Sequence, residues 1–143
     1  MREMAIVYRT TPATRGILAG PIRSPRDAAC LLDRILGEET VEVFGALLLN
    51  SRKRVLAWHE VARGSLDRVD VHPREVFKAA LLANSACILL AHCHPSGDPE
   101  PSAEDQALTE RLKAAGTLLG IEIVDHVVVG DGRYTSFRES GRL

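Results

Sequence analysis

The sequence lacks the features that would place the protein in a membrane or in an oxidising compartment. Its 143 residues include only three cysteines, which cannot pair completely and have no C-x-x-C spacing. Such usage is typical of a reducing compartment. No apolar run approaches the ~18 residues of a membrane span, and residues 1–20 lack the apolar stretch of a secretory signal peptide. We therefore expect a cytoplasmic protein.

The chain also lacks an excess of either charge. Eighteen basic residues stand against nineteen acidic ones, which gives a formal net charge of -1. This balance provides no general electrostatic attraction to nucleic acid, and the basic triplet at residues 52–54 is typical of a solvated turn. Nucleic acid stays open as a partner, but the net charge does not support it.

Hydrophobic patterning predicts one α/β domain, a mixed β-sheet flanked by helices. The length and the 45% hydrophobic content fit a single core. We expect residues 1–23 to form an N-terminal strand, at residues 4–8, and a connecting arm, and residues 24–143 to form the domain. Gly116 and Gly120 predict a turn, and residues 64–73 a loop. The predicted elements are helices at 25–37, 73–83 and 103–115, and strands at 43–49, 55–61, 85–91, 121–129 and 133–137.

The most unusual chemistry is in residues 91–105, AHCHPSGDPEPSAED. His92 and His94 follow an apolar run that predicts a buried strand. In a strand, residues two apart point the same way, about 6.6 Å apart at the backbone. Both imidazoles can therefore bind one ion at Zn–N distances of about 2.0–2.1 Å, while Cys93 faces the other way.

The prolines and the glycine that follow predict a loop leading to a helix. Ser102 is the expected N-cap and Asp105 lies in the first turn. Taken alone, Asp105 is typical of a capping box. If the loop returns this turn to the histidines, His92, His94 and Asp105 form a ligand set with an open fourth position, which is typical of catalytic zinc.

The spacing His92-x-His94, seven residues, Ser102, two residues, Asp105 resembles the signature of the JAMM (MPN) metalloproteases, and HPSGDPEPS resembles its RadC-type branch. The resemblance covers residues 24–143 and implies the cytidine-deaminase-like sandwich of that family. It also implies Zn²⁺ as cofactor, Glu42 as the general base and acid, and Ser102 as a group that stabilises the transition state. Cys93 departs from the asparagine usual in RadC-type proteins. These proteins usually carry a preceding helical module, so we expect the isolated domain here.

The implied activity is zinc-dependent hydrolysis of amide or isopeptide bonds in a peptide or protein substrate. A different class stays open, namely a non-catalytic metal-containing binding module or a DNA-repair accessory module. Glu42 favours catalysis, because a purely structural site does not need a carboxylate outside its ligands. The spacing argues against nucleobase deaminases, which need H-x-E with P-C-x-x-C, and against H-E-x-x-H proteases.

The other histidines are interpreted as structural. His59 lies in a predicted strand without ligand spacing around it, and His72 precedes a predicted helix. Asp125 and His126 are adjacent in a strand, so their side chains point to opposite faces and do not readily bind one ion. We therefore expect hydrogen-bonding roles for this pair.

Overall fold

Five strands and three helices are formed by the described residues of the computed structural model, which are 1–5, 7–12, 14–17, 20–64 and 71–143. In chain order they are α1 (Pro25–Leu36), β1 (Val43–Leu49), β2 (Val55–Arg63), α2 (Pro73–Leu82), β3 (Cys87–Cys93), α3 (Ala103–Leu119), β4 (Glu122–Gly130) and β5 (Arg133–Ser136). None of the helices in this part of the chain combines the length and apolar composition that crossing a bilayer requires.

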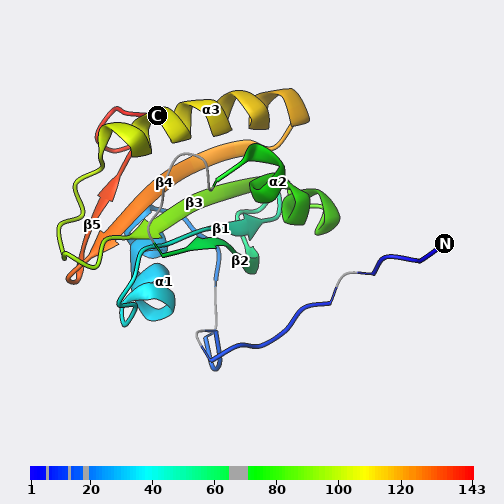
Figure 1. Ribbon diagram of the computed structural model, residues 1–143, viewed down its shortest axis with the longest axis horizontal. Helices are drawn as coiled ribbons and strands as arrows, with labels where there is room; N and C mark the ends of the chain where they lie inside the picture. The colour runs from blue at the N-terminus through cyan, green and yellow to red at the C-terminus, as the bar shows by residue number, and fades with distance from the viewer. Residues whose placement is uncertain (6, 13, 18–19, 65–70) are drawn as a thin grey trace.

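The strands form one mixed sheet in the order β2-β1-β3-β4-β5 (Figure 1). β3 lies in the middle, antiparallel to β1 and parallel to β4. β2 and β5 are the outer strands, and each pairs antiparallel with its neighbour. The predicted mixed α/β sheet is confirmed, and so is the predicted adjacency of the strand after Glu42 to the strand that ends in the histidines.

Helices cover both faces of the sheet, and side-chain alternation in β3 assigns its residues to the two faces. Leu89, Ala91 and Cys93 belong to the core cluster that includes α1. Ile88 and Leu90 belong to the cluster that includes α2 and α3. The layers are therefore α1, the sheet, and the pair α2 and α3 (Figure 1). His92 lies on the face of Ile88 and Leu90, and Cys93 lies on the opposite face, as alternation predicts.

The predicted turn between Gly116 and Gly120 was wrong, because α3 continues to Leu119. Gly116 lies inside the helix where it crosses the start of β4. A Cβ atom added to Gly116 would lie 2.5 Å from the carbonyl oxygen of Ile121, so a glycine permits the close approach. Gly120 ends the helix with a left-handed φ of 72°.

Two other predictions concern segments that lie partly outside the described residues. The strand predicted at residues 4–8 is not formed by Met4, Ala5, Val7 and Tyr8, which are exposed and lie outside the strands, and Ile6 is outside the described residues. These four residues have no neighbouring strand to complete their backbone hydrogen bonds. Most of the loop predicted at residues 64–73 also lies outside the described residues, which resume at position 71.

The loop between β3 and α3 packs closely against the end of β4. A Cβ atom added to Gly130 would lie 2.9 Å from the carbonyl carbon and oxygen of Gly97 in that loop. The Arg133 guanidinium donates a hydrogen bond of 2.9 Å to the Gly97 carbonyl. The backbone N–H of His94 donates one of 3.0 Å to the Val129 carbonyl. The β4–β5 hairpin thereby fixes the loop that follows the histidines.

We predict that Gly130→Ala lowers the free energy of unfolding by about 1–3 kcal/mol, the usual cost of an added atom in a closely packed region. Urea denaturation would measure the loss. Gly20→Ala is the matched control, because a Cβ atom there would have nothing within 4 Å. Equal stability of the two variants would contradict the close approach of Gly130 and Gly97.

Candidate metal centre

His92 is held rigidly near the end of β3. Its side chain is only 1% exposed. The Phe44 ring of β1 stacks on the imidazole at a centroid distance of 6.0 Å. On the other side, Nδ1 of His92 lies 2.8 Å from Nε2 of His126 in β4. Because Nδ1 is engaged inside the protein, Nε2 is the nitrogen that faces the end of the strand.

His94 follows the last residue of β3, at the start of the loop. Its Nδ1 lies 2.7 Å from the backbone carbonyl of Asp98. A carbonyl only accepts hydrogen bonds, so Nδ1 carries the proton and Nε2 is directed toward His92. The loop closes behind the ring with a hydrogen bond of 3.0 Å from the Gly97 N–H to the His94 carbonyl. The turn therefore sets the orientation of the His94 ring and leaves Nε2 as the nitrogen that faces His92.

Asp105 reaches the histidines from the first turn of α3. Ser102 and Asp105 form a capping box, in which the Asp105 N–H donates to Oγ of Ser102 at 3.1 Å. In return, Oδ2 of Asp105 accepts a hydrogen bond of 2.8 Å from the Ser102 N–H. The capping interpretation is therefore correct for this residue. It does not exclude a second role, because a carboxylate oxygen accepts more than one partner.

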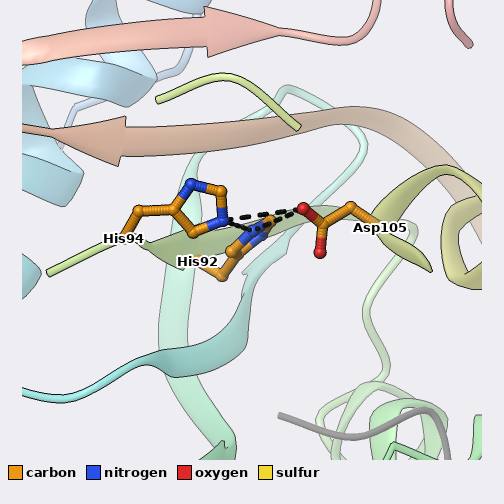
Figure 2. Close-up of side chains that lie close together, drawn as sticks. All are labelled: His92, His94 and Asp105. Carbon is orange, nitrogen blue, oxygen red and sulfur yellow. Dashed lines mark hydrogen bonds and ion pairs between the residues drawn. The ribbon is translucent and has the colours of Figure 1, made fainter. Parts of the chain in front are cut away.

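Nε2 of His92, Nε2 of His94 and Oδ2 of Asp105 converge on one point (Figure 2). The two Nε2 atoms lie 2.9 Å apart. Oδ2 lies 3.3 Å from Nε2 of His92 and 3.6 Å from Nε2 of His94. Ligand atoms lie about 3.3 Å apart in a tetrahedral site with bonds of about 2.0–2.1 Å. The three side chains therefore fit a single metal ion, and the loop does return Asp105 to the histidines.

Electrostatics also favour a cation at this point. Burial opposes ionisation of Asp105, but hydrogen bonds from His92 and His94 outweigh it and hold its pKa well below the usual range. The same bond to Asp105 raises the pKa of His94, against the effect of burial. The carboxylate thus keeps its negative charge at any physiological pH and attracts a positive charge to the two imidazoles.

Glu42 lies at the rim of this group. The antiparallel register pairs Phe44 of β1 with His92 of β3, so the residue two before Phe44 lies beside the residue two after His92. The Oε1 atom of Glu42 is accordingly 3.9 Å from Nε2 of His94. The backbone of Glu42 is held by a hydrogen bond of 2.8 Å from the Gly64 N–H to its carbonyl. The structure therefore brings all five predicted site residues to one end of the sheet.

Residues outside this group have the structural roles expected of them. Cys93 points to the α1 side, where its thiol contacts the Val41 carbonyl at 3.5 Å and burial raises its pKa. Nε2 of His59 donates to the Glu75 carbonyl at 3.0 Å. His72 is the N-cap residue of α2. Asp125 accepts a hydrogen bond of 2.6 Å from the Ser136 hydroxyl, which confirms its predicted hydrogen-bonding role.

Sequence reasoning did not connect His126 or Thr109 with the metal centre. His126 contacts His92 directly, and its Nδ1 lies 2.6 Å from Oγ1 of Thr109 in α3. His126 is fully buried, and burial holds its pKa well below the usual range. A buried histidine next to an aspartate in an apolar strand was the available signal, but strand alternation alone does not specify which face it occupies.

The chain is similar to proteins from bacteria and archaea. A profile of the RadC-like JAB domain matches residues 22–142. The UPF0758 protein of Methanosarcina acetivorans is 48% identical over 142 residues, which cover 97% of this chain and 62% of the relative. The UPF0758 protein of Clostridium beijerinckii is 45% identical over 143 residues, covering 100% of this chain and 62% of the relative. The UPF0758 protein of Nitrosococcus oceani is 53% identical over 102 residues, which cover 71% of this chain and 46% of the relative. This chain thus spans 46–62% of the length of these relatives.

We predict that wild-type protein binds one metal ion per chain and that the double variant His92→Ala, His94→Ala loses it. Removal of two of three ligands leaves one carboxylate, which binds a transition metal weakly. Elemental analysis after gel filtration would measure the metal content. His59→Ala is the matched control, because His59 is bonded to Glu75 and is not among the three convergent residues. Full metal retention in the double variant would refute the assignment.

We also predict that Cys93→Ser retains the metal and the fold. Its side chain lies on the α1 face, away from His92, and a serine hydroxyl can donate to the Val41 carbonyl as the thiol does. Metal content and thermal unfolding of this variant would be compared with those of the wild type. Loss of the ion would show that the sulfur belongs to the ligand set.

Proposed function

The chain belongs to the RadC-like JAB domain family, and on that premise we propose that it is a zinc-dependent hydrolase of amide or isopeptide bonds in peptide or protein substrates. Two imidazole nitrogens and one carboxylate oxygen are a donor set that suits zinc and leaves a fourth position open. When bound, zinc supplies the Lewis acidity that makes water a nucleophile near neutral pH. The remaining chemistry is assigned to Glu42 and Ser102.

The position of Glu42 is the observation that carries the proposal. Its carboxylate lies 3.9 Å from His94, outside the convergent group yet adjacent to it. At this place it can accept a proton from the attacking water and donate it to the leaving amine. A purely structural metal site does not require a carboxylate beside its ligands. Proton transfer therefore accounts for Glu42, and metal retention alone does not.

Ser102 can act on the substrate because its hydrogen bonds with the described residues do not use the hydroxyl proton. Its Oγ accepts from the Asp105 N–H at 3.1 Å, as the helix cap requires. A hydroxyl also donates one hydrogen bond, and this proton is the one that we assign to the oxygen of the attacked carbonyl. The N-cap role and the stabilising role use different parts of the same hydroxyl group.

The direction of substrate approach follows from the exposure of the side chains. His92 is 1% exposed, His94 13%, Asp105 18% and Glu42 34%. The centre is thus closed on the β3 side and opens progressively toward Glu42. A substrate carbonyl entering from that side meets the proton acceptor and the open metal position together, which suits an extended peptide segment.

We predict that Glu42→Gln keeps zinc and lowers hydrolysis by about 10² to 10⁴, the usual contribution of general acid–base catalysis. Glutamine preserves the shape but accepts no proton at neutral pH. Zinc content and cleavage of a panel of peptides and isopeptide-linked conjugates would be measured for the same preparations. Glu122→Gln is the matched control, because Glu122 is an exposed carboxylate at the other end of β4.

Two results would count against the proposal. Unchanged cleavage by Glu42→Gln would remove the proton-transfer role of this residue. Zinc binding by the wild type without cleavage of any conjugate in the panel would favour the non-catalytic binding module instead.

A further inference from the structure

We propose that His126 is a positioning residue that keeps a proton on Nδ1 of His92 and thereby directs Nε2 of His92 toward the metal centre. The inference rests on the metal centre of the proposed function, but it does not depend on hydrolysis. Its basis is an unbroken buried series of hydrogen bonds that begins at the backbone of Asp105 and ends at the ring of His92.

The direction of this series is set at its Asp105 end. The carbonyl of Asp105 can only accept, and Oγ1 of Thr109 lies 2.7 Å from it. The Thr109 hydroxyl has one proton, which it donates to that carbonyl, one turn earlier in α3. Oγ1 must therefore accept from its other partner. That partner is Nδ1 of His126, at 2.6 Å, which consequently carries a proton.

The position of the proton on the His126 ring then determines that Nδ1 of His92 carries a proton. His126 is fully buried, and apart from His92 the rings packed on it are those of Phe44 and Phe137, which supply no charge. A cation in this place would lose its hydration without compensation. With its proton on Nδ1, neutral His126 offers the electron pair of Nε2, and Nδ1 of His92 donates to it at 2.8 Å. Nε2 of His92 is then the ring nitrogen that faces the metal centre, beside Nε2 of His94 and Oδ2 of Asp105.

A local irregularity in the sheet brings His126 to this position. The parallel register of β3 and β4 shifts between Ile88 and Leu89, whose partners are Ile123 and Asp125. The residue Val124 is bypassed, which reverses the alternation along β4. His126 thereby reaches the face that carries His92, although regular alternation from Ile123 would direct it toward α1.

Two ligands of the centre are therefore linked through one buried histidine. Thr109 ties His126 to the first turn of α3, which carries Asp105, and His126 orients the ring of His92 on β3. Partners of this kind around metal-binding histidines typically contribute 10–100-fold to metal affinity. His126 does not touch the metal position, so its contribution is to orientation and proton placement.

The test compares three variants of the full chain. His126→Phe preserves the ring that stacks on Phe137 but removes both hydrogen bonds, and we expect its zinc affinity to fall 10–100-fold in chelator competition. His126→Gln supplies an amide oxygen for His92, so its affinity should lie closer to that of the wild type than that of His126→Phe does. Phe137→Leu disturbs the same packing without removing a hydrogen bond and should leave the affinity near the wild-type value.

A second measurement needs neither zinc nor turnover. Nitrogen-15 chemical shifts of metal-free wild-type protein report whether Nδ1 of His92 carries a proton, and we expect that it does. In the His126→Phe variant this proton should be partly lost from Nδ1. Absence of a proton on Nδ1 in the wild type, or wild-type zinc affinity in His126→Phe, would overturn the inference. Absence of zinc binding by the wild type would overturn the proposed function, whereas the shifts of His92 would still decide the role of His126.

Discussion

The antiparallel pairing of β1 with β3 is the constraint on which the candidate site depends. The two strands are buried throughout, and the register that aligns Phe44 with His92 is fixed because a slip by one residue would turn each apolar side chain to the wrong face. This register carries Glu42, which precedes β1, to the side of His94, which follows β3. The packing of the hydrophobic core thereby determines the distance between the Glu42 carboxylate and the His94 imidazole, which are far apart in the sequence.

Each of the three ligand side chains is held by its own backbone or side-chain partner. Asp98 holds His94, the Ser102 N–H holds Asp105, and His126 holds His92. The partners of the two histidines contact Nδ1, which leaves both Nε2 atoms to converge, whereas Oδ2 of Asp105 both accepts from the Ser102 N–H and faces the histidines. Partners that hold the ligand side chains in place reduce the reorganisation that ion binding requires.

Sequence reasoning predicted the parts of the site that depend on local spacing. The same-face pair His92 and His94 follows from strand alternation. A loop rich in proline and glycine before an N-cap residue allowed the return of Asp105 to the histidines but did not require it. The roles of Glu42 and Ser102 came from the family resemblance and stay proposals. The face of His126 could not be predicted, because it depends on the register shift beside Leu89. Gly116 was misassigned because its role depends on close contacts with the Ile121 carbonyl, just after the helix, and with the ring of Phe77 in α2.

The Asp105 carboxylate both caps α3 and belongs to the candidate metal centre, so ion release is coupled to fraying of the first turn of α3. One oxygen, Oδ2, accepts the Ser102 N–H that caps α3 and also faces the two histidines. Any opening of the first turn of α3 removes a ligand, and an ion held there opposes that opening by its binding free energy. Amide protons at the start of α3 would therefore exchange with solvent more slowly as the free ion concentration rises, because local unfolding of this turn and occupancy of the centre are linked equilibria.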